Sequence, residues 1–179
     1  MKTREIILGV SASIAIYKTC LLIRRLKDEG FNVTVVMTEK AKEFIQPLLF
    51  ERLSQNKVYT EFFSKIDDYK IEHISLADKA DLVLLAPATA DLIGRIASGI
   101  ADDLLTSLVM ATKAKVWICP AMDENMYRNK IVQYNIKKLK SYGYKFIGPQ
   151  KGKLASGKMG WGRLVEIETI VQKVKEYFL

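Results

Sequence analysis

Short, nearly uninterrupted apolar runs alternate with amphipathic segments along most of this 179-residue chain. The apolar runs predict buried strands at residues 6–9, 33–37, 58–63, 81–86, 115–119 and 144–147. Helical periodicity predicts the main intervening helices at about 13–27, 91–98, 103–111, 125–142 and 166–179. Strands that are apolar on both faces and separated by helices are typical of a parallel sheet covered on both sides. The sequence therefore predicts a single α/β domain, residues 1–179, with a doubly wound parallel sheet.

Composition excludes several classes of protein. Cys20 and Cys119 have neither metal-ligand spacing nor the density of a disulfide framework, so we expect no metal site and a cytoplasmic setting. The sequence contains no run of about 18 apolar residues, so it predicts no membrane-spanning helix. The net charge is +8, and residues 113–163 hold twelve Lys or Arg against two acids. Such an excess of positive charge favours phosphorylated ligands or nucleic acid, although four of the ten lysines fall on one amphipathic helix, where a solvated face is the usual meaning. No RNA-recognition motif is present, so we expect a phosphorylated small ligand rather than nucleic acid.

The first turn, residues 9–18, follows an apolar strand and opens a helix. Gly9 is its single glycine, so the turn matches neither the three-glycine dinucleotide loop nor the P-loop. Ser11 and Ser13 place hydroxyl groups where the strand becomes a helix. The segment is therefore either a phosphate site or a plain turn in which Ser13 caps the helix.

Four segments follow predicted strands, and in an open parallel sheet ligands bind beyond the carboxyl ends of the strands. Pro87 and Pro120 end two of those strands and leave irregular backbone that suits contact with a flat heteroaromatic ring. We expect the four segments to meet at one edge. They are the Ser11–Ser13 turn, Thr38, residues 86–91 and residues 120–127.

Two further features invite a functional interpretation. His73 is the only histidine and has polar neighbours; it is either structural or a base suited to proton transfer near neutrality. Residues 149–163 carry four glycines and four cationic side chains. This segment is either a linker or a mobile clamp over an anion.

Five motifs, in order along almost the whole chain, resemble the flavin-containing cysteine decarboxylase family. They are the 9–18 turn, His73-Ile74-Ser75-Leu76, residues 86–91 with 99–105, residues 120–122 with Met126-Tyr127, and residues 154–163. The resemblance implies a Rossmann-like (flavodoxin-like) fold and FMN as cofactor. It also implies a carboxy-lyase of coenzyme A biosynthesis, which converts 4′-phosphopantothenoylcysteine to 4′-phosphopantetheine and carbon dioxide. The flavin would oxidise the thiol, so that the resulting thioaldehyde stabilises the carbanion left by carbon dioxide.

The same resemblance assigns roles to individual residues. His73 would be the catalytic base, with Asp123 and Ser156 as further catalytic residues. Asp123 and Met126 would contact the substrate, and the clamp would contribute Lys158 and Arg163. The cofactor-binding residues would be Gly9, Ser11, Ser13, Thr38, Ala88, Thr89 and Ala90.

Two residues depart from the family pattern. Many members have Asn where this chain has Asp123, and an ionised Asp would repel a substrate carboxylate unless it is protonated or bonded elsewhere. Many have Cys where this chain has Ser156, and a hydroxyl is a poorer proton donor than a thiol. The oxidation and decarboxylation are therefore better supported than the closing reduction.

Three other functions stay open at this point. One is a flavin-dependent decarboxylase of another cysteine-terminated substrate, and another is a flavin prenyltransferase, which the first turn and the His73 motif disfavour. The third is a non-catalytic, flavin-binding regulatory protein. The resemblance also implies a homotrimer or dodecamer with the flavin between subunits, and a fused or separate phosphopantothenate-cysteine ligase as partner.

Overall fold

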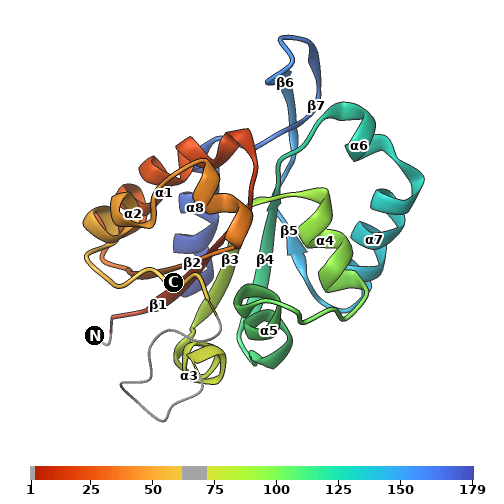
Figure 1. The fold of residues 1–179 in the computed structure, drawn as a ribbon. Helices are drawn as coiled ribbons and strands as arrows, with labels where there is room; N and C mark the ends of the chain where they lie inside the picture. Colours follow the sequence, from red (N-terminus) through yellow and green to blue (C-terminus); the bar gives the residue numbers. More distant parts are fainter. Residues whose placement is uncertain (1–2, 62–71) are drawn as a thin grey trace.

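The central sheet has five parallel strands in the order β2-β1-β3-β4-β5 (Figure 1). This computed structural model describes residues 3–61 and 72–179. The strand order reverses between β1 and β3, and such a reversal opens a crevice beyond the carboxyl ends of the strands. The strands are β1 (Glu5–Val10), β2 (Asn32–Met37), β3 (Leu82–Ala88), β4 (Lys115–Pro120) and β5 (Lys145–Phe146). The predicted doubly wound α/β sheet is confirmed.

Helices cover both faces of the sheet because the apolar strands present side chains alternately to each side. In β1, for example, Ile6 and Leu8 pack into one core and Ile7 into the other. One face carries α1 (Tyr17–Asp28), α2 (Pro47–Ser54) and α8 (Ile167–Phe178). The other carries α3 (Glu72–Lys79), α4 (Ala90–Ala97), α5 (Leu104–Ala111) and α7 (Lys130–Ser141).

Short elements follow the carboxyl ends of the strands. They are η1 (Ile14–Ile16) after β1, η2 (Glu39–Glu43) after β2 and α6 (Glu124–Arg128) after β4. A separate antiparallel hairpin is formed by β6 (Gln150–Lys153) and β7 (Met159–Arg163), and it projects beyond this end of the sheet (Figure 1). None of the helices in the described ranges is both long and apolar enough to cross a bilayer.

Four elements differ from the sequence prediction. The expected strand at 58–63 is reduced, in its described part, to an isolated bridge between Val36 and Tyr59, and residues 62–63 lie outside the described residues. The helix expected at 125–142 is two helices, because Asn129 leaves the helical conformation and its side chain caps α7. The glycine-rich 149–163 segment contains the β6–β7 hairpin, and α3 was not predicted.

Candidate active site

A cavity of about 1060 Å³ lies beyond the carboxyl ends of the strands, where the sequence placed the four segments. It is at the upper end of the usual size of ligand pockets, about 300–1,000 Å³. Its wall combines the first turn, the ends of β2, β3 and β4, and the hairpin. The lining residues include Ser11–Ala15, Thr38–Lys40, Thr89–Asp91, Ala121–Asp123, Met126, Lys153–Ser156 and Gly162–Leu164.

Ser11 joins the first turn to the end of β3. Its hydroxyl donates to the Pro87 carbonyl at 2.8 Å and accepts the Thr89 amide at 3.0 Å, and its own amide also donates to Pro87 at 3.2 Å. The side chain is almost fully buried. Ser11 therefore lines the cavity with a hydroxyl whose hydrogen bonds are already made within the protein.

Ser13 and Thr38 are more available to a ligand. Ser13 caps η1 through a long hydrogen bond from the Ala15 amide (3.3 Å) and donates weakly to the Ala121 carbonyl (3.4 Å). Thr38 ends β2 and its side chain makes no capping bond to η2. Both line the cavity where a strand passes into a helical turn, which is a favourable place for an anion.

Two predicted cofactor residues lie beneath the cavity rather than in its wall. Gly9 is within the sheet, and a Cβ there would lie 2.5 Å from Leu85 Cδ2 and 2.6 Å from Leu105 Cδ1. Ala88 is fully buried at the end of β3, where its carbonyl accepts the Ala121 amide at 3.0 Å. Packing thus explains both small residues, whereas Thr89 and Ala90 do line the cavity.

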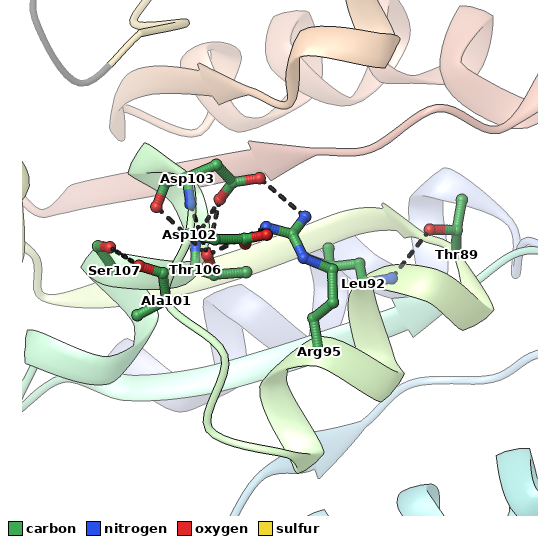
Figure 2. A network of polar contacts seen from close by, with 8 residues as sticks. All are labelled: Thr89, Leu92, Arg95, Ala101, Asp102, Asp103, Thr106 and Ser107. Atoms are coloured by element: carbon green, nitrogen blue, oxygen red, sulfur yellow. Dashed lines mark hydrogen bonds and ion pairs between the residues drawn. The ribbon is translucent and has the colours of Figure 1, made fainter.

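Arg95 fixes the loop between α4 and α5 at the cavity wall (Figure 2). Its guanidinium pairs with Asp102 and, at 2.8 Å, with Asp103. Hydrogen bonding to Arg95 lowers the pKa of the Asp102 carboxyl. Asp103 also forms a capping box with Thr106 at the start of α5. The Nε atom of Arg95 is buried and has no hydrogen-bond partner in the described part of the chain.

Asp123 and Met126 stand where β4 leads into α6, and both line the cavity. Asp123 is the cap of α6, and its Oδ1 accepts the Asn125 amide at 2.9 Å. One oxygen of the carboxylate is therefore hydrogen-bonded within the protein. A hydrogen bond of this kind is one of the two conditions under which we expect an Asp at this position to tolerate a substrate carboxylate.

The hairpin supplies the facing wall. Ser156 and Arg163 line the cavity, and Arg163 pairs with Glu166 at 2.8 Å. Lys158 is exposed in the hairpin and is not among the lining residues, whereas Lys153 is. Lys153 and Arg163 are thus the cationic side chains of the hairpin that line the cavity.

Lys18 is a lining residue to which the sequence argument gave no role of its own. Its ammonium nitrogen is buried, makes no hydrogen bond within the described residues and lies 3.9 Å from the Glu166 carboxylate. Burial lowers the pKa of Lys18, while Glu166 acts in the opposite direction. Its position in the sequence could have indicated a role, because Lys18 lies in the first turn of α1, a helix that begins at the edge of the sheet where ligands bind.

His73 is half-buried in the first turn of α3 and does not line the cavity of its own chain. The other end of α3 is tied to the amino ends of β1 and β2, because Lys79 pairs with Glu5 at 3.1 Å and donates to Thr34 at 3.2 Å. Figure 1 shows α3 at the end of the sheet opposite the hairpin. The single chain therefore does not bring its histidine to its cavity.

Sequence comparisons cover the whole chain. The profile of the flavoprotein family matches residues 1–179. The coenzyme A biosynthesis bifunctional protein CoaBC of Bacillus subtilis is 47% identical over 178 residues, which is 99% of this chain and 44% of that protein. A probable phosphopantothenoylcysteine decarboxylase of Streptococcus mutans is 45% identical over 176 residues, 97% of this chain and 98% of that protein. The chain thus spans less than half of the bifunctional relative and nearly all of the streptococcal one.

Solved structures agree with this picture. A cysteine-to-serine variant of PPC decarboxylase, complexed with pantothenoylaminoethenethiol, has a TM-score of 0.86 and is 28% identical, with 99% of each chain covered. The peptidyl-cysteine decarboxylase EpiD has a TM-score of 0.82 and is 26% identical, covering 97% of this chain and 99% of that one.

Proposed function

Since the chain belongs to the flavoprotein family, we propose that it is an FMN-dependent phosphopantothenoylcysteine decarboxylase, a carboxy-lyase of coenzyme A biosynthesis. The observation that carries this proposal is the large cavity on which the first turn, the β3 and β4 ends and the hairpin converge. Similarity to the streptococcal and bifunctional proteins over nearly the whole chain supports it.

The residues present suit FMN. The cavity is large enough for a flavin together with a substrate. Ser13 and Thr38 would hold the phosphate beside the helical turn, Ser11 would brace that turn, and Thr89 and Ala90 would line the ring. When bound, the flavin would supply two-electron oxidation of the substrate thiol and return the electrons later.

The cations in the wall suit the substrate's charge. Lys18 and Arg163 offer positive charge to the carboxylate and phosphate of 4′-phosphopantothenoylcysteine. Asp123 uses one oxygen to cap α6, so it offers an acceptor to the cavity where an Asn would offer a donor. We expect Asp123 to accept a hydrogen bond from the substrate. The carboxylate and the phosphate of the substrate would bind to Lys18 and Arg163.

Ser156 would be the hydroxyl that protonates the decarboxylated intermediate, and its position in the hairpin wall of the same cavity supports this role. A hydroxyl is a weaker acid than a thiol, so we expect this closing step to be slow. Ser156→Cys should leave carbon dioxide release nearly unchanged and speed conversion of the enethiol to 4′-phosphopantetheine. Mass spectrometry of intermediate and product measures the ratio, and an unchanged ratio would show that another group donates the proton.

His73 would act across a subunit boundary, as the catalytic base in the cavity of a neighbouring copy. The reason is that it does not line its own cavity, while apolar side chains are exposed on and next to the elements that follow β1 and β2. Those side chains are Ile14, Tyr17, Phe44, Leu48 and Leu49. The assembly would be a homotrimer or a dodecamer built from such trimers.

Mixing two inactive variants tests this arrangement. His73→Asn should keep flavin but lose carbon dioxide release, and Ser13→Glu should lose flavin because a carboxylate repels the phosphate. Co-refolded in equal amounts, they should recover roughly a quarter of the wild-type activity, since some sites combine a sound cavity with a sound histidine. Light scattering that shows a flavin-bound monomer, or a mixture with no recovery, would contradict the shared site.

The direct test of function is carbon dioxide release from 4′-phosphopantothenoylcysteine by the yellow, FMN-loaded protein. A matched assay with a peptide ending in cysteine tests the second candidate, which the likeness to peptidyl-cysteine decarboxylase EpiD favours. Flavin binding without turnover of either substrate would favour a regulatory flavoprotein, and prenyl transfer to flavin would identify a prenyltransferase. We further propose a cytoplasmic location and a fused or separate ligase that supplies the substrate.

A further inference from the structure

Strand β7 of the hairpin approaches the start of α6 with its backbone, not with side chains. A Cβ at Gly160 would lie 2.5 Å from Glu124 Oε2. At Gly162, where φ is +126°, a Cβ would collide with the Met122 carbonyl oxygen. Gly162 therefore requires glycine, and a side chain at Gly160 would push the Glu124 carboxylate out of its present position.

Two hydrogen bonds close this contact. The Met122 amide donates to the Gly162 carbonyl at 3.0 Å, and the Trp161 amide donates to Glu124 Oε1 at 3.3 Å. Arg128 holds the same carboxylate, with Nε at 3.0 Å and Nη2 at 2.9 Å. The hydrogen bond from Trp161 is the main cause that lowers the pKa of Glu124, with Arg128 and Lys151 acting in the same direction. Glu124 is thus kept ionised while it bridges helix and hairpin.

A plain surface ion pair between Glu124 and Arg128 does not account for these facts. Exposed pairs at this helical spacing contribute little to stability, and they need no glycine on a neighbouring strand. Here the carboxylate also accepts a backbone amide of a different element, and Gly160 leaves the room for it. The contact is specific to docking of the hairpin.

We propose that Glu124 is a positioning residue that holds the β6–β7 hairpin over the cavity. The hairpin carries Ser156 and Arg163, and the segment that it docks against carries Asp123 and Met126, so one contact sets the spacing of the two facing walls. This inference rests on the proposed function only for the identity of the substrate. If the hairpin is docked in a smaller fraction of molecules, apparent substrate affinity falls by the same factor.

Hydrogen exchange of the FMN-loaded protein without substrate tests the docking itself. Loss of a charge-assisted hydrogen bond should shift the docking equilibrium by about tenfold, so Glu124→Ala should speed exchange in residues 150–163 by about that factor. Glu124→Gln keeps an acceptor and should restore part of the protection. Gly160→Ala should reproduce the loss although Glu124 is not substituted. The control is Glu176→Ala, which removes a similar exposed i,i+4 contact with Gln172 on α8.

Kinetics with 4′-phosphopantothenoylcysteine provide the second measurement. Because a hairpin that remains mostly docked loses little of its docked fraction, Glu124→Ala should raise KM by less than about twofold and leave kcat nearly unchanged, and Glu176→Ala should change neither. Unchanged hairpin exchange in Glu124→Ala, or faster exchange spread evenly over the whole chain, would overturn the proposal. If even the wild-type protein does not turn over this substrate, the proposed function fails, while the exchange result still decides whether Glu124 docks the hairpin.

Discussion

Replacing Ser11 by Ala should destabilise the protein before any flavin is bound. The change removes a nearly buried hydroxyl that joins β1 to β3. Pro87 keeps one hydrogen bond, from the Ser11 amide at 3.2 Å, but the Thr89 amide loses its acceptor. A buried donor left without a partner costs about 1–3 kcal/mol, and because the Thr89 amide is only partly buried we expect a loss near the low end, about 1 kcal/mol.

Ser13→Ala is the matched control. Its hydroxyl makes two long bonds, 3.3 Å and 3.4 Å, so its loss should fall near the low end of the capping range, at about 0.5 kcal/mol. Urea unfolding of flavin-free protein measures both, at one protein concentration because assembly adds to stability. Ser11→Ala should lower the midpoint with an unchanged slope. If Ser11→Ala weakens FMN binding but leaves flavin-free stability intact, the hydroxyl is a ligand contact and the argument is wrong.

Three further outcomes follow from the described residues. Asp103→Ala removes the capping box of α5 and should lower the free energy of unfolding by about 1 kcal/mol, measured in urea. Burial raises the pKa of both thiols and most strongly that of Cys119, so in native protein at pH 8 iodoacetamide should modify Cys20 slowly and Cys119 not at all, as read by mass spectrometry. Hairpin docking lowers the pKa of Glu124, so the contribution of the ionised carboxylate to docking should be complete above the ordinary value of 4.5 and be lost as the pH falls through the lowered value. The NMR shift of the Trp161 amide should follow that loss, and a pH-independent shift would contradict it.

The sheet was predictable because its strands are buried on both faces, which leaves apolar runs in the sequence. The hairpin left no such signal, since β6 and β7 consist mostly of Gly and Lys, and only their glycines are buried. Their pairing is explained by docking against α6, which is a tertiary contact. The break at Asn129 is likewise local chemistry that periodicity does not report, because the flanking residues continue the helical pattern.

The location of the site at one edge of the sheet was predictable, whereas the roles of its individual residues were less so. Topology alone brings the carboxyl ends of parallel strands together, so Ser13, Thr38 and Asp123 were found without knowing their contacts. Gly9 was interpreted as a cofactor residue, whereas its glycine is explained by Leu85 and Leu105, which lie far away in sequence. The sequence alone does not distinguish a glycine that leaves room for a ligand from a glycine that leaves room for a neighbouring side chain.

His73 shows where reasoning from one chain ends. The sequence supplies one imidazole, and its motif indicates chemistry, yet the fold ties α3 by Lys79 to the amino ends of β1 and β2 while the cavity opens at the carboxyl ends. A base must come within hydrogen-bond distance of the proton it removes. If His73 is the base, the cavity that it serves belongs to another copy, and assembly is then a condition of catalysis. Apolar side chains exposed on η1, α1 and α2 are what such an assembly would cover.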